Sequence, residues 1–93
     1  MRLLGSEPIA QADKRLEAMR RNPAGDWRIE DIAAVCRARG VECVAPSRGS
    51  HYRVAHPAMT AILTIPAHRP IKRVYIREFV AYIDAVESAE NDE

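Results

Sequence analysis

A short polar stretch, SRGSHY at residues 47–52, lies between two segments in which apolar and polar residues alternate as they do in β-strands. The chain has to reverse direction there, and a glycine-bearing polar stretch between two strands predicts a tight β-hairpin turn. Gly49 provides the backbone freedom that such a turn requires. His51 then opens the second strand. We expect its side chain at the open end of the hairpin, where a fold presents reactive groups without giving up its core.

The spacing of apolar residues predicts elements in the order helix, helix, three antiparallel strands, helix. The predicted helices cover residues 9–21, 26–39 and 71–88, and the predicted strands cover 41–45, 51–56 and 59–65. We expect Asp26 and Gly40 to cap the second helix, Trp27 to lie in its first turn, and Pro70 to lie in the first turn of the last helix. This is an α+β fold with the helix–strand–strand–strand–helix layout of double-stranded-RNA-binding domains. An additional N-terminal helix, over 9–21, packs at the domain edge.

Alternation within the strands assigns side chains to the two faces of the sheet. Tyr52 and Val54 are apolar and should face the helices, which places His51 and Arg53 side by side on the outer face. In the third strand the same pattern turns Ala61 inward.

The length of 93 residues allows one domain, spanning 1–93 with a core over about 26–88. No apolar run is long enough to cross a membrane, and the first six residues are too short an apolar patch for a signal peptide, so we expect a cytoplasmic protein. Cys36 and Cys43 lack the spacing of metal ligands, and each falls at an expected core position.

The net charge of +1 conceals an uneven distribution. Of the 13 acids, residues 84–93 hold five, and the remaining 8 face 14 bases. We expect the acidic end beyond the last helix to fray. No acid lies between Cys43 and Arg77, an interval that holds all three histidines. Such a stretch favours a polyanionic partner, most simply nucleic acid, and a solvated surface that happens to lack acids explains it about as well.

Histidine chemistry on RNA provides a specific hypothesis for the hairpin. RNA carries its own nucleophile, the 2′-hydroxyl, and a base placed against it lets that oxygen attack the adjacent phosphate. Histidine suits this role because its ordinary pKa lies near neutrality. We therefore take His51 as general base or acid, with Arg48 and Arg53 as the nearest cations for the charge that develops on phosphorus. Three histidines without cysteine or acid partners nearby make a poor metal site.

Other polar and aromatic residues around the hairpin allow more than one interpretation. His68 either hydrogen-bonds its own loop or serves as a second acid–base or phosphate-contacting group. Ser50 shapes the turn and donates to phosphate. Tyr52 belongs to the core more readily than to a base-stacking surface. His56 precedes a proline in a turn and is expected to be exposed and idle.

Three features occur together along the chain: Gly40, RGSHY at residues 48–52 and LTIPAH at residues 63–68. This combination resembles the HicA family of toxin ribonucleases, in which a Gly-Ser-His turn follows the first strand and Pro-x-His follows the third. The resemblance covers about residues 27–83. It implies that His51 is the catalytic residue, that the substrate is mRNA, and that a HicB antitoxin neutralises the protein.

The chain departs from the family pattern in two places. Arg69-Pro70-Ile71-Lys72 replaces the glycine-rich segment that commonly leads into the last helix, and this bears on RNA contact. The helix over 9–21 is additional and looks like the extension carried by one branch of the family, which bears on dimerisation or antitoxin docking.

Three functions stay open from the sequence. They are a toxin endoribonuclease that cuts mRNA by metal-independent transesterification, a non-catalytic RNA-binding module of the same fold, and a protein-binding subunit whose basic face meets an acidic partner. A titratable histidine favours the first, because plain binding needs positive charge more than a titratable group. We expect no cofactor and no metal, and leave homodimerisation open. The predicted RNA-binding set around His51 is Arg48, Gly49, Ser50, Arg53, His68, Lys72 and Arg73.

Overall fold

The computed structural model describes residues 6–91, with side chains from residue 11 onward, and confirms the α+β class and the order of elements. A three-stranded antiparallel sheet has the strand order β1-β2-β3. The elements are α1 (Ser6–Arg21), α2 (Ile29–Arg39), β1 (Glu42–Val44), β2 (His51–Ala55), β3 (Leu63–Pro66) and α3 (Arg73–Asn91).

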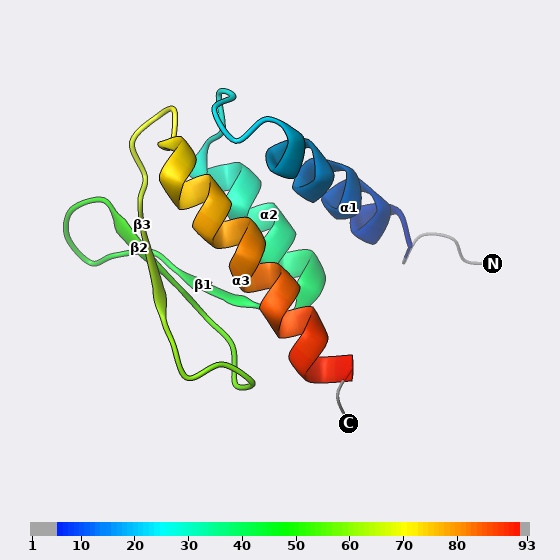
Figure 1. Cartoon of the computed structure of the whole chain (residues 1–93). Coiled ribbons are helices and arrows are strands. Elements are labelled where there is room, and N and C mark those ends of the chain that lie inside the picture. Colours follow the sequence, from blue (N-terminus) through cyan, green and yellow to red (C-terminus); the bar gives the residue numbers. More distant parts are fainter. Residues whose placement is uncertain (1–5, 92–93) are drawn as a thin grey trace.

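The elements form three layers (Figure 1). Helices α2 and α3 lie together on one face of the sheet, and α1 contacts both of them on their far side. We expected the first helix at the domain edge, but it forms a full outer layer instead. Its apolar spacing of three and four residues buries Ala12, Leu16 and Met19, and Met19 has no exposed surface.

The predicted alternation in β2 is confirmed. Val54 has no exposed surface and Tyr52 is half-buried, whereas His51 and Arg53 are exposed on the outer face. The core between the sheet and the helices consists of aliphatic and aromatic side chains, Cys36 among them as predicted. Its members are Leu16, Met19, Ile32, Val35, Cys36, Val41, Val54, Ile65, Ile71, Ile76, Phe79, Val80, Tyr82, Ile83 and Val86.

The third strand is shorter than predicted. It begins at Leu63 rather than at residue 59, and Ala61, which we expected to face inward, is exposed. The backbone before the strand finds other partners. The Tyr82 hydroxyl of α3 donates to the carbonyl oxygen of Ala61 over 2.8 Å, and the Met59 N–H donates to the carbonyl of His56 over 2.9 Å. These groups therefore have no need of a strand neighbour.

Helix α2 begins later than predicted, and Asp26 does not cap it. The N-cap is Arg28, whose backbone N–H donates to the Asp31 carboxylate over 3.0 Å. Trp27 precedes the helix, and its indole N–H donates to the carbonyl of Asn22 over 2.8 Å. At the other end the prediction is confirmed, because the residue after Arg39 is a left-handed glycine, with φ of 70°.

The segment that leads into α3 also differs from the prediction. The helix begins at Arg73, so Pro70 lies before its first turn. Between them Ile71 is only 2% exposed, and its backbone N–H donates to the carbonyl of Trp27 over 2.9 Å. The start of α3 is thus anchored to the connection between α1 and α2.

The acidic end of the chain does not fray at residue 88. Helix α3 continues to Asn91, and Asp84, Glu87 and Glu90 each have a basic partner. Glu87 accepts from Arg39 over 2.9 Å, and Arg39 also pairs with Asp13 of α1, so this arginine joins all three helices.

His56 is neither exposed nor idle, contrary to the prediction. Its side chain is 10% exposed, and Nδ1 accepts from the Ala58 backbone N–H over 3.0 Å. Nε2 therefore carries the ring proton and lies 3.1 Å from a carboxylate oxygen of Glu90. The histidine ties the turn between β2 and β3 to the last turns of α3. None of the described helices is long and apolar enough to cross a membrane.

Candidate functional site

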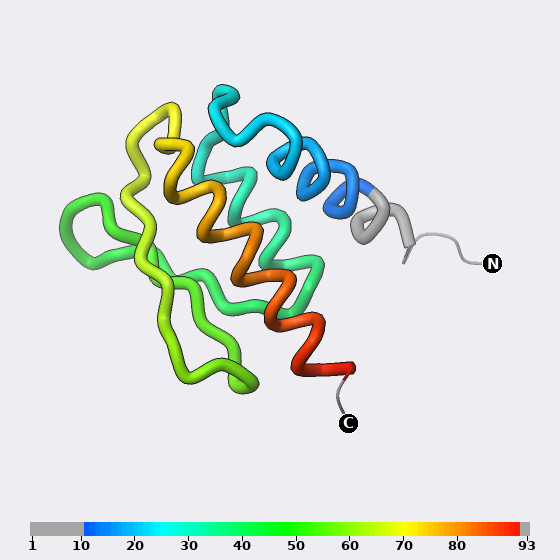
Figure 2. The backbone as a smooth tube through the Cα atoms, viewed as in Figure 1, coloured from blue at the N-terminus to red at the C-terminus, as the bar shows by residue number. Residues whose placement is uncertain are grey.

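The predicted tight turn is a wider loop over residues 45–50 that projects away from the helices (Figure 2). Pairing of β1 with β2 ends at Val44 and Arg53, so His51 pairs only with Pro66 of β3. Gly49 has φ of 77°, a left-handed conformation that side chains disfavour, which confirms the role predicted for it.

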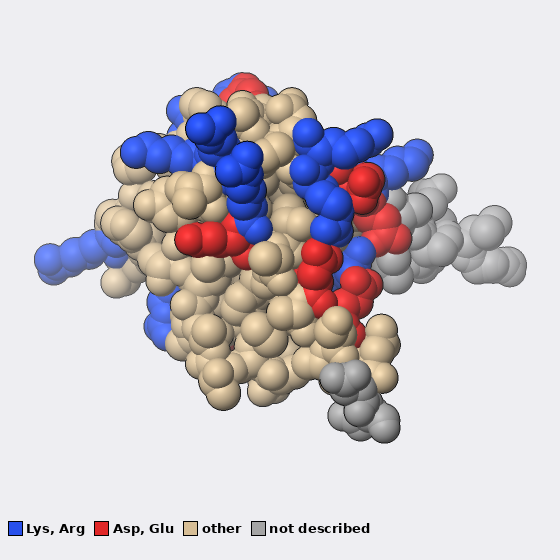
Figure 3. Space-filling view, in the orientation of Figure 1, with Lys and Arg blue, Asp and Glu red and all other residues tan. Residues whose placement is uncertain are grey.

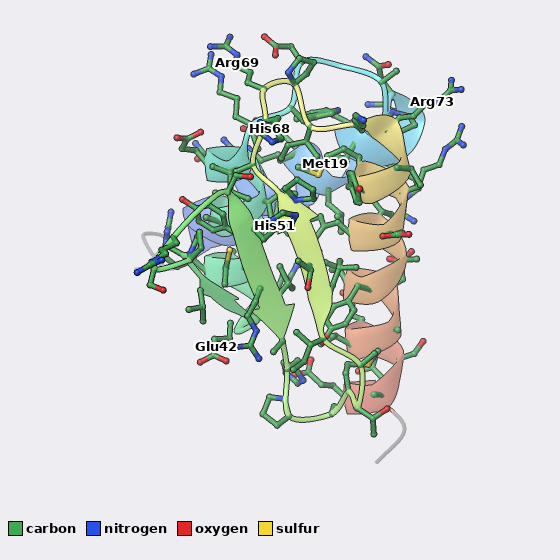
Figure 4. All side chains as sticks on the ribbon, turned by 90° about the vertical axis from the view of Figure 1, so that its left-hand side faces the viewer. Met19, Glu42, His51, His68, Arg69 and Arg73 are labelled. Carbon is green, nitrogen blue, oxygen red and sulfur yellow. The ribbon has the colours of Figure 1, made fainter. Side chains whose placement is uncertain are left out.

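His51 lines a cleft of about 260 Å³ between the sheet end and the start of α3. Three segments contribute to it: the beginning of β2, the end of β3 with its following loop, and the first turn of α3. Figure 4 shows His51 and His68 at the same end of the sheet. The residues around the cleft are His51, Pro66, His68, Pro70, Lys72 and Tyr75.

The register of β2 and β3 brings the two histidines to one cleft. His51 pairs with Pro66, and the Ala67 N–H donates to the Ser50 carbonyl over 2.8 Å, which continues the ladder beyond the strand ends. His68 follows at once. Its Nε2 lies 3.4 Å from Ser50 Oγ, at the long end of hydrogen-bonding distance. His68 thus contacts Ser50 of the neighbouring loop and lines the cleft, and its acid–base or phosphate-contacting role stays a prediction.

The predicted cations are only partly gathered at this cleft. Lys72 lines it, whereas Arg73, the next residue, points away from His51 on the other side of α3 (Figure 4). Arg53 is exposed on the same outer face as His51, two positions along β2, and Arg48 is exposed in the loop. Among the residues whose side chains the structure describes, no acid pairs with Arg48, Arg53 or Lys72.

The acid-free interval of the sequence is not free of acids in space. Arg69 pairs with Asp26, from the connection between α1 and α2, over 2.9 Å. The arginine holds the pKa of the Asp26 carboxyl below its usual value. Its own charge is therefore compensated, which the sequence order did not predict.

Positive charge still predominates where α3 begins. In Figure 3 the Lys and Arg side chains on the visible face lie mainly in its upper half, over α1 and the start of α3. The first turn of α3 contains no acid. The partial positive charge of that helix end therefore adds to the charge of Lys72 at the cleft.

Three residues that line the cleft were not predicted as site residues: Tyr75, Pro66 and Pro70. The sequence did contain a usable signal for Tyr75, because it lies three positions after Lys72 and residues three apart share one side of a helix.

No cluster of three or more metal-ligating side chains occurs among the described residues. No protein-family model, curated protein or solved structure matches the chain. The arrangement of the cleft therefore carries the functional argument together with the sequence motifs.

Proposed function

We propose that the protein is an endoribonuclease that cuts RNA by metal-independent transesterification at the cleft of His51 and His68. The observation that carries the proposal is that two histidines from separate segments, together with Lys72, line one small cleft. Displacement at a phosphodiester needs one group that takes a proton and a second that gives one, and histidine performs either task near neutral pH.

Each proton transfer of this reaction can be assigned to a residue. One imidazole, which we assign to His51, removes the proton of the 2′-hydroxyl while that oxygen attacks phosphorus. The bond from phosphorus to the 5′-oxygen breaks, and the protonated imidazole of His68 donates its proton to that leaving oxygen. The products are a 2′,3′-cyclic phosphate and a 5′-hydroxyl. Lys72 and the amino end of α3 stabilise the negative charge that develops on the phosphoryl oxygens.

The fold and the motifs support RNA as substrate. The sheet with α2 and α3 on one face has the helix–strand–strand–strand–helix layout of double-stranded-RNA-binding domains, with α1 added as an outer layer. The resemblance to HicA adds mRNA as the substrate class and a HicB-like antitoxin as the partner that neutralises the protein. The third function open from the sequence, a protein-binding subunit, predicts no affinity for RNA at all.

The test is incubation of the purified protein with a labelled single-stranded RNA in the presence of EDTA. We expect cleavage with cyclic-phosphate and 5′-hydroxyl ends, and no cleavage of the same oligomer with 2′-deoxy sugars. His51→Ala should abolish cutting and His68→Ala should slow it by about 10²–10⁴-fold, the usual contribution of general acid–base catalysis.

A matched control removes a histidine elsewhere. His56→Asn keeps an acceptor for the Ala58 N–H and lies outside the cleft, so it should cut at the wild-type rate. Products with a 5′-phosphate, or activity that survives His51→Ala, would contradict the mechanism.

A second function is favoured by one observation: Arg48 and Arg53 are exposed and without acidic partners among the described side chains, as in a surface that only binds phosphates. A non-catalytic RNA-binding module would bind with steep salt dependence and leave the RNA uncut. The same purified protein and oligomer distinguish the two functions.

A further inference from the structure

Half of the cleft lining has no part in the acid–base chemistry. Tyr75, Pro66 and Pro70 provide ring surfaces beside the two histidines and Lys72. Tyr75 packs against the core with part of its side chain and contributes the rest to the cleft. Its hydroxyl has no hydrogen-bond partner among the described residues, in contrast to Tyr82, whose hydroxyl donates to a backbone carbonyl over 2.8 Å.

We infer that Tyr75, Pro66 and Pro70 form a subsite for one unpaired nucleobase of the RNA, next to the phosphate that the histidines act on. The inference rests on the proposed function in one respect, namely that the partner is RNA. The volume of about 260 Å³ lies below the usual range of small-molecule pockets, about 300–1,000 Å³. The cleft therefore suits a single flat ring better than a whole nucleotide pair.

The chemistry of the lining matches a base better than a phosphate or sugar. Aromatic rings stack on bases of any kind, because every base has a π-face. The cationic and titratable groups on the same cleft hold the adjoining phosphates, so the base and the phosphate of a nucleotide each have a partner.

A subsite for an unpaired base implies a preference for single-stranded over double-stranded RNA, which the layout of the fold does not imply. Bases in a duplex stay stacked on their neighbours and reach no aromatic wall, whereas single strands splay their bases outward. A protein with the layout of a double-stranded-RNA-binding domain should therefore prefer single strands here.

The test measures binding and uses RNA that cannot be cut. A short RNA with 2′-O-methyl groups throughout lacks the nucleophile, and its binding to wild type and variants is followed by fluorescence anisotropy at constant salt. Tyr75→Leu keeps an apolar side chain and removes the ring. We expect it to bind the single strand about 5- to 140-fold more weakly, the range for loss of one stacked base. Its affinity for the same oligomer annealed to its complement should not change.

Three matched variants define what the loss means. Tyr75→Phe keeps the ring and should bind like wild type. Tyr52→Leu removes a tyrosine that faces the helices outside the cleft and should also bind like wild type. Lys72→Ala should weaken single strand and duplex alike and reduce the salt dependence by about one phosphate contact.

Three results would overturn the subsite. One is equal weakening of single strand and duplex by Tyr75→Leu, and another is a Tyr75→Phe variant as weak as the leucine variant. The third is an unchanged affinity of Tyr75→Leu for the single strand. Because no arm depends on cleavage, the subsite and the enzyme fail separately: ring-dependent binding without cutting leaves the subsite and removes the endoribonuclease.

Discussion

Replacing Met19 by alanine measures how much the outer helix contributes to the fold. Met19 has no exposed surface and lies in α1, which contacts both α2 and α3. Truncating a buried methionine costs about 2–5 kcal/mol, and the cost depends on how far the surroundings collapse into the cavity. Helix α1 is covered on one side only and is free to settle inward. We therefore expect a loss of about 2–3 kcal/mol, a large part of the roughly 5–15 kcal/mol available to a folded domain.

Urea and thermal unfolding, followed by circular dichroism and by the fluorescence of Trp27, measure this loss. For a domain of this size about 1 kcal/mol lowers Tm by about 4–8 °C, so Tm should fall by roughly 10–20 °C. The matched control is Lys14→Ala, at an exposed position of the same helix, which should change stability by less than about 0.5 kcal/mol.

The result that would refute this reasoning is a loss below about 1 kcal/mol in Met19→Ala with an unchanged urea dependence. In that case α1 would be an appended helix whose contacts contribute little. If α1 unfolded before the rest of the domain, two transitions would be seen. That result would contradict the view that α1 is an integral layer of the fold.

Three further predictions concern charge and thiol chemistry. Asp26→Asn should strengthen binding to RNA and leave the urea midpoint nearly unchanged, because it frees the exposed guanidinium of Arg69; unaltered affinity in an anisotropy titration would contradict this. The Arg20 guanidinium holds the pKa of Asp84 below its usual value, so the pair stabilises the fold above the ordinary carboxyl pKa and this contribution is lost as pH falls through the lowered one. Asp84→Asn should therefore flatten the acid limb of a plot of Tm against pH, and an unchanged limb would argue against the pair. A hydrogen bond from the buried thiol of Cys36 lowers the pKa of the half-buried Cys43 thiol. Iodoacetamide should therefore modify Cys43 before Cys36 in the native protein, as followed by mass spectrometry. First modification at Cys36 would contradict this order of reactivity.

Burial on one side made the faces of β2 predictable. Tyr52 and Val54 are apolar and Arg53 between them is charged, so only one register places the apolar pair against the helices. The exposure of His51 and Arg53 follows from that single constraint. The apolar spacing of α1 likewise accounts for its buried residues, but it does not reveal that α1 covers two helices at once.

Two of the predictions that failed depended on partners far along the chain. Asp26 is a suitable cap by its residue type, but Arg69 pairs with it from across the fold. Residues before β3 have strand-like composition, but the Tyr82 hydroxyl binds the Ala61 carbonyl from α3. Local propensity cannot predict such contacts, because they exist only after the helices have packed against the sheet.

The candidate site also combines residues that the sequence pattern predicts with residues that only the packed fold brings together. His51 and His68 meet because β2 and β3 are joined in one register, and that register follows from the apolar pattern, with Tyr52 opposite Ile65. The two histidine motifs could therefore be recognised in the sequence, and the pairing of β2 with β3 brings them to one cleft in the structure. Tyr75 enters the same cleft for another reason. The start of α3 is held by burial of Ile71 and its bond to the carbonyl of Trp27, a contact between segments far apart in the chain. The candidate acid–base groups could thus be found from motifs, whereas the proposed aromatic wall for an unpaired base required the packed structure.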